Sequence, residues 1–60
     1  MNINELLKEI RTKKGYSLDV LGEKIGFSKG YLHNVEIGAR PVSKKLLEAF
    51  TKAFPEYKKN

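Results

Sequence analysis

The sequence predicts a compact all-α domain of four helices, and three observations support this prediction. Four segments place apolar residues at intervals of three and four, which is the period of an amphipathic helix. Each segment follows an Asn or a Ser, residue types that cap helix N-termini. No useful length of chain alternates apolar and polar residues, so no strand is expected. With 60 residues there is room for one small core, and we expect residues 1–60 to form a single domain.

The first helix is expected over residues 3–14. Asn2 is its predicted N-cap, with Glu5 three residues later as the capping-box partner. Gly15 ends the helix, because glycine readily adopts the left-handed conformation of a helix terminus. The apolar stripe consists of Ile3, Leu6, Leu7 and Ile10.

The second helix is expected over residues 18–25, capped by Ser17 and ended by Gly26, which can take a positive φ in the following turn. Val20 falls off its apolar stripe and should be partly exposed. Gly22 should lie close to where the third helix crosses, and its missing side chain would allow the two helices to pack closely. The apolar face consists of Leu18, Leu21 and Ile25.

The third helix is expected over residues 29–37, between the cap Ser28 and the terminating Gly38. Leu32 and Val35 should point into the core. The residues expected on the opposite face are Gly30, His33, Asn34 and Ile37, with Lys29 on the flank.

The fourth helix is expected over residues 44–54, between the cap Ser43 and Pro55. Its broad apolar face comprises Leu46, Leu47, Phe50, Ala53 and Phe54. Beyond it the chain has room for a vestigial fifth helix at most, formed if Tyr57 docks on the core, and Lys58 and Lys59 are expected to fray. The predicted core is Leu6, Ile10, Leu21, Ile25, Leu32, Val35, Leu47, Phe50 and Phe54.

The composition excludes several classes of function. The chain has no cysteine and one histidine, which rules out disulfides and cysteine nucleophiles and leaves no set of metal ligands. No base–nucleophile pair is evident, so we expect neither an enzyme nor a cofactor. The longest apolar runs are two or three residues and the N-terminus does not resemble a signal peptide, so we expect a cytoplasmic protein without a membrane span.

Charge and spacing point towards an anionic partner. The net charge is +5, which favours nucleic acid or an anionic membrane surface, although lysine-rich surfaces also serve solubility alone. The second and third helices meet at Gly26 through a turn of about three residues, so the third helix should project its polar face outward. Such a helix fits the major groove of DNA. The alternative is an ordinary helical hairpin within a small bundle.

Residues 15–36 also carry a more specific pattern, G-Y-S-L-D-V-L-G-E-K-I-G-F-S-K-G-Y-L-H-N-V-E. It resembles the repressor/Cro-type (xenobiotic-response-element) helix-turn-helix family, and the resemblance extends from Leu6 to Phe54. Residues 38–43, G-A-R-P-V-S, are similar to that family's connector after the recognition helix. The resemblance implies a repressor-like fold with its motif at 18–37 and its recognition helix at 28–37. It also implies a sequence-specific transcriptional regulator, with repression as the expected mode, that binds double-stranded operator DNA.

The same resemblance assigns roles to individual residues. It implies base recognition by Lys29, Gly30 and Asn34, with His33 alongside, and phosphate contacts near Ser17, Leu18 and Arg40. Ser28 and Tyr31 complete the expected DNA-binding set, although Tyr31 is equally suited to closing the edge of the core. Arg11 and Glu36 are expected to pair, which would lock the recognition helix onto the first helix.

Several departures from the family pattern affect the expected function. Gly22 replaces a preferred alanine, Gly30 removes one direct contact and Leu18 stands where glutamine is frequent. The fifth helix, which often dimerises in the family, is nearly absent, so we expect at most a weak homodimer on a palindromic operator. The competing function is a protein-interaction module whose exposed apolar residues would be Val20, Ile37 and Tyr57.

Overall fold

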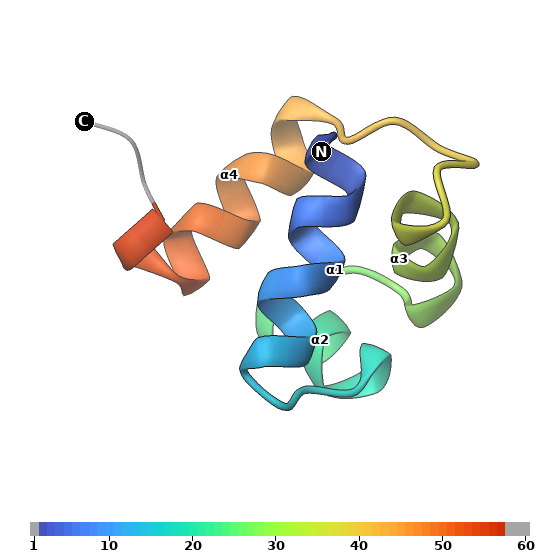
Figure 1. The fold of residues 1–60 in the computed structure, drawn as a ribbon. Coiled ribbons are helices and arrows are strands. Elements are labelled where there is room, and N and C mark those ends of the chain that lie inside the picture. Colours follow the sequence, from blue (N-terminus) through green and yellow to red (C-terminus); the bar gives the residue numbers. More distant parts are fainter. Residues whose placement is uncertain (1, 58–60) are drawn as a thin grey trace.

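The computed structural model describes residues 2–57, and every regular element in that range is a helix. Four α-helices are followed by one 3₁₀ turn (Figure 1). They are α1 (Ile3–Lys13), α2 (Leu18–Ile25), α3 (Lys29–Glu36), α4 (Lys44–Ala53) and η1 (Pro55–Tyr57). The predicted all-α class and the four predicted helices are therefore confirmed, whereas Lys58 and Lys59 lie outside the described residues.

Three helices end one residue before their predicted ends. Lys14, Ile37 and Phe54 are the C-caps of α1, α3 and α4, and each still donates its N–H to the carbonyl four residues earlier. All four predicted N-caps are present, because each side-chain oxygen accepts a backbone N–H three residues further on at 2.9–3.2 Å. Local sequence signals thus determine where these helices begin and end.

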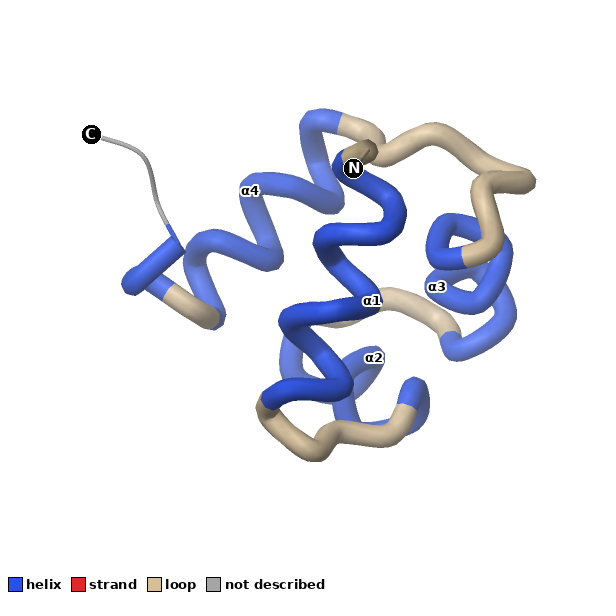
Figure 2. The backbone as a smooth tube through the Cα atoms, viewed as in Figure 1, coloured by secondary structure: helices blue, strands red, loops and turns tan. Residues whose placement is uncertain are grey.

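The helices enclose one core. α2 packs against α3 and α4, and α1 packs against α3, while residues 37–43 form the longest loop and lead from α3 to α4 (Figure 2). The buried apolar residues are Leu7, Ile10, Leu21, Ile25, Leu32, Val35, Leu46, Phe50 and Phe54. All predicted core residues except Leu6 and Leu47 belong to this set.

The prediction for Leu6 was wrong, because α1 buries a face centred on its neighbour. Leu6 is 38% exposed and Leu7 only 5%. Asn4 and Arg11, three residues before and four after Leu7, lie on the same side of the helix and bond to residues of α3. Two polar residues therefore lie on the inward face of α1. Because the prediction used apolar residues alone, it placed the centre of the buried face at the wrong residue.

The prediction for Leu47 was wrong for a related reason. Leu47 is 40% exposed, whereas Leu46 is completely buried. Val42, Ala49 and Ala53 pack against the core beside Leu46 and shift the buried face of α4 towards it. Both leucines fit the helical period, so the packing partners decide between them.

Gly22 lies against the turn backbone more closely than against α3. A Cβ atom built on Gly22 would lie 2.4 Å from the Phe27 carbonyl oxygen and 3.7 Å from Leu32 Cδ1. The second distance is an ordinary contact, so the expected role in helix–helix packing is corrected. The missing side chain instead admits the backbone of the turn, whose Gly26 and Phe27 N–H groups both donate to the Gly22 carbonyl.

The expected fifth helix is reduced to the single turn η1, which is attached to the end of α1. Lys14 Nζ lies 2.6 Å from Glu56 Oε2. The same ammonium lies 4.9 Å from the ring centre of Phe54 and 5.6 Å from that of Tyr57. Among the described residues, no helix has both the length and the apolar character needed to cross a membrane.

Candidate nucleic-acid interface

The segment from α2 to α3 presents one polar helix face to the surroundings. The turn between the two helices is residues 26–28, and it begins at Gly26, whose φ of 79° is easily adopted by glycine. Leu32 and Val35 hold α3 on the core, with 4% and 1% of their surface exposed. Because side chains opposite this buried stripe must point outward, the turn and the core together fix the direction of the polar face.

Lys29 is an accessible cation on the flank of this face. Its side chain is 63% exposed, and its Nζ lies 3.7 Å from Asp19 Oδ2 at the start of α2. An ion pair this loose and this exposed contributes little to stability. Lys29 can therefore exchange Asp19 for a phosphate or a guanine edge at small cost. Asp19 was not predicted as a neighbour of Lys29.

The other outward positions of α3 differ in what they can offer. His33 is exposed and Asn34 is half-buried. Gly30 is exposed, and a Cβ atom built on it would have no neighbour within 4 Å. His33 and Asn34 can present polar side chains to a ligand, whereas Gly30 can contribute only its backbone.

Tyr31 closes the edge of the core. Its half-buried ring stacks on Phe27, with 5.5 Å between ring centres and 24° between ring planes. Its hydroxyl lies 3.5 Å from Ser43 Oγ, at the start of α4. Of the two roles considered for this ring, the structure shows the packing one, and the exposed part of the half-buried side chain stays available to a ligand.

Ser17 and Ser28 are committed to capping but keep a donor. Each hydroxyl oxygen accepts a backbone N–H at 3.2 Å, from Val20 and from Tyr31 respectively. A serine hydroxyl that accepts can still donate its own proton, for example to a phosphate oxygen. Leu18 is half-buried and packs against the core, so its backbone and the exposed part of its side chain are available for contact.

Arg40 is exposed in the loop after α3, and its backbone is anchored on both sides. Its N–H and that of Ala39 donate to the Asn34 carbonyl at 3.2 and 2.8 Å. Its own carbonyl accepts from Asn4 Nδ2 at 2.9 Å. Sequence reasoning did not single out Asn4, although its spacing of seven residues from Arg11 was a usable signal.

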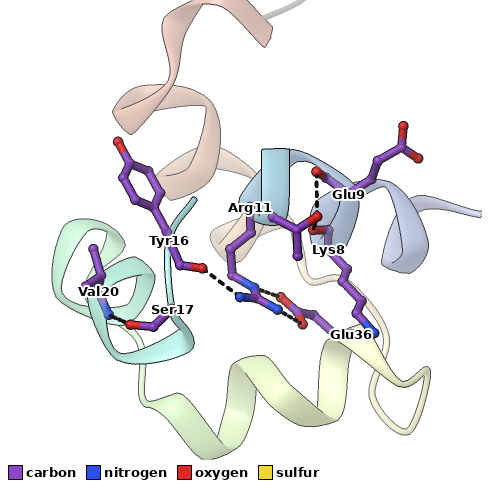
Figure 3. A network of polar contacts seen from close by, with 8 residues as sticks. Lys8, Glu9, Arg11, Tyr16, Ser17, Val20 and Glu36 are labelled. Carbon is purple, nitrogen blue, oxygen red and sulfur yellow. Dashed lines mark hydrogen bonds and ion pairs between the residues drawn. The ribbon is translucent and has the colours of Figure 1, made fainter. Parts of the chain in front are cut away.

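Arg11 and Glu36 form a bidentate ion pair between α1 and the last residue of α3 (Figure 3). Arg11 Nε and Nη2 donate to the two carboxylate oxygens at 2.6 and 3.0 Å, and Nη1 donates to the Tyr16 carbonyl at 2.7 Å. The two side chains are 13% and 6% exposed. Shared hydrogen bonds in a nearly dry site fix the orientation of both groups. The end of α3 is therefore held on α1.

Two short helices joined by a three-residue turn, the second with an exposed polar face, define a helix-turn-helix protein. A family model described as a helix-turn-helix domain matches residues 5–54, and the chain belongs to that family. The match agrees with the repressor/Cro-type resemblance and indicates a DNA-binding protein. No curated protein and no solved structure matches the chain.

Proposed function

We propose that this protein is a sequence-specific transcriptional regulator, acting as a repressor, that places α3 in the major groove of operator DNA. The observation that carries the proposal is the polar face of α3, which projects opposite the buried Leu32 and Val35 from a turn fixed at Gly26. An α-helix fits the width of the major groove, where every base pair presents a distinct pattern of donors and acceptors.

The outward side chains of α3 divide the recognition task. Asn34 has both a donor and an acceptor and is suited to the N6 and N7 edge of adenine. Lys29, at the first turn of α3, can reach a guanine edge or a phosphate, and His33 lies beside Asn34 on the exposed side. Unpaired N–H groups at the N-terminal end of α3 favour its deepest insertion there.

Further phosphate contacts are expected from outside the recognition helix. Arg40 follows α3 in the loop, and Ser17 precedes α2, so the two residues lie at either end of the helix-turn-helix segment. The net charge of +5 supports this part of the proposal, because neutralised phosphates release counterions and provide affinity for any sequence. Affinity should therefore fall steeply as salt rises.

Selection of bound sequences from random duplex DNA supplies the site for a test. A palindromic result would support two copies on one face of the duplex, with centres one helical turn or about 34–36 Å apart. Failure to enrich any sequence would contradict sequence-specific recognition. Sedimentation of the free protein measures whether the dimer exists before DNA is added.

Two alanine variants then separate base recognition from phosphate contact. Asn34→Ala should cost about 1–3 kcal/mol on the selected site and relax the preference at one base pair. It leaves intact the Asn34 backbone carbonyl that holds the loop. Arg40→Ala should weaken selected and scrambled duplexes alike and lower the salt slope by about one. If Asn34→Ala weakens both duplexes equally, the assignment of the recognition face is wrong.

A further inference from the structure

The side-chain amide of Asn4 joins α1 to two separate parts of the chain. Its Nδ2 donates to the Val35 carbonyl at 2.7 Å and to the Arg40 carbonyl at 2.9 Å. An asparagine amide has two N–H donors, so these bonds use both. Asn2 already caps α1 by accepting the Glu5 N–H, so Asn4 is not required for that purpose.

The two carbonyls bonded by Asn4 belong to the recognition helix and to the loop that follows it. Val35 lies in the last turn of α3, and Arg40 lies four residues after the end of that helix. Because the Arg40 N–H donates to the Asn34 carbonyl, both polar groups of the Arg40 backbone are bonded. Pro41 follows, and its ring limits φ at the next position. The backbone that carries the Arg40 guanidinium is thus fixed with respect to α3.

Asn4 complements the ion pair of Arg11 on the same helix. The two residues are seven positions apart, which places them on one side of α1 and about 10.5 Å apart along its axis. Arg11 holds the end of α3 through Glu36, and Asn4 holds the loop immediately beyond it. α1 therefore positions two successive segments of the proposed interface, although none of the proposed DNA contacts comes from α1.

We propose that Asn4 is a positioning residue that holds Arg40 in place for its phosphate contact, an inference that rests on the proposed function. A long exposed side chain loses conformational freedom when it binds, and that loss grows if its backbone must also be ordered. By ordering the backbone in advance, Asn4 leaves only side-chain rotamers to be fixed on binding. Asn4→Ala should therefore weaken DNA binding without removing any charge.

Amide hydrogen exchange tests the positioning step without DNA. In Asn4→Ala, the amides of Ala39 and Arg40 should exchange several-fold faster than in the unmodified protein, because the loop opens locally. Asn2→Ala is the matched control. It also removes a side-chain amide, but the bond that it breaks is the N-cap bond to the Glu5 N–H and not a bond to the loop. If the Ala39 and Arg40 amides exchange at the same rate in Asn4→Ala and in Asn2→Ala, the proposal is overturned.

A double-mutant cycle with Arg40→Ala on the selected duplex tests the link to DNA binding. Asn4→Ala should weaken binding in the unmodified protein and have little effect once Arg40 is gone. In the Arg40→Ala variant, which loses one phosphate contact, the loss of affinity between roughly 50 and 200 mM salt should also be about three- to fourfold smaller. Equal effects of Asn4→Ala in both backgrounds would overturn the proposal. If the unmodified protein binds no duplex, the proposed function fails, and with it the phosphate contact, while the exchange result still decides whether Asn4 fixes the loop.

Discussion

Replacing Arg11 by methionine should be among the most damaging single changes in this protein. The variant keeps an apolar stem but loses the three guanidinium bonds, two to the Glu36 carboxylate and one to the Tyr16 carbonyl. It also leaves that carboxylate without its partner in a site where the side chain is only 6% exposed. Breaking a buried pair from one side costs about 3–5 kcal/mol, because the remaining charge keeps its desolvation penalty.

That cost is large compared with the whole stability of such a small domain. A chain of 60 residues is expected to unfold at a cost of about 3–9 kcal/mol. Arg11→Met should therefore lose about a third or more of the free energy of unfolding. Glu36→Gln is the milder companion, at a cost of about 1–3 kcal/mol: its amide oxygen still accepts one Arg11 N–H, whereas its NH2 group replaces the second acceptor, so one hydrogen bond and the charge are lost.

The double variant Arg11→Met with Glu36→Leu should be more stable than Arg11→Met alone. It removes both charges and fills the site with apolar groups, so no unpaired carboxylate remains. We expect a coupling energy of about 2–3 kcal/mol from urea unfolding followed by circular dichroism. The exposed Lys29–Asp19 pair is the control, with coupling of about 0–1 kcal/mol. Coupling at Arg11 and Glu36 no larger than in this control would refute the reasoning.

Three further outcomes are expected. Phe50→Ala should lower the free energy of unfolding by about 3–5 kcal/mol, because Phe50 is 2% exposed in the centre of the core, and an unchanged melting curve would contradict that position. Gly22→Ala should gain about 1 kcal/mol of stability from helix propensity. It should lose about 1–3 kcal/mol to steric strain, because its Cβ would lie 2.4 Å from the Phe27 carbonyl oxygen. A raised melting temperature would show that the turn yields easily. The hydrogen bond between Lys14 and Glu56 raises the pKa of Lys14 above 10.5 and lowers the pKa of Glu56 below 4.5. The stabilisation from this bond should be present at neutral pH and be lost as pH falls through the Glu56 pKa or rises through the Lys14 pKa. In Lys14→Gln, NMR titration of the carboxyl groups should show the pKa of Glu56 shifted back towards 4.5. A pKa of Glu56 equal to that in the unmodified protein would argue against the bond.

The helix ends could be predicted from the sequence because they depend on neighbours three or four residues away. A capping serine such as Ser28 acts on an amide within its own helix, and Gly26 acts through its own φ. The exposed face of α3 could also be predicted, since it lies opposite Leu32 and Val35 on any regular helix. Such signals are contained in short stretches of chain.

The remaining features depend on residues that are distant in the sequence. Leu6 and Leu47 fit the helical period as well as Leu7 and Leu46 do, and only the packing partners decide which are buried. Asn4 bonds to carbonyls 31 and 36 residues away, and no periodicity of apolar residues reveals an asparagine that faces inward.

The two ends of α3 are held differently, and its first turn should tolerate substitution. The C-terminal end is bound to α1 through the Val35 carbonyl and the Glu36 carboxylate, whereas Gly30 near the N-terminal end faces open space. A Cβ atom introduced at Gly30 has no neighbour within 4 Å, and alanine there also raises helix propensity by about 1 kcal/mol. On the function proposed above, target preference should therefore be changeable at this position without loss of the fold, and a library confined to Lys29 and Gly30 should yield folded proteins with new DNA targets.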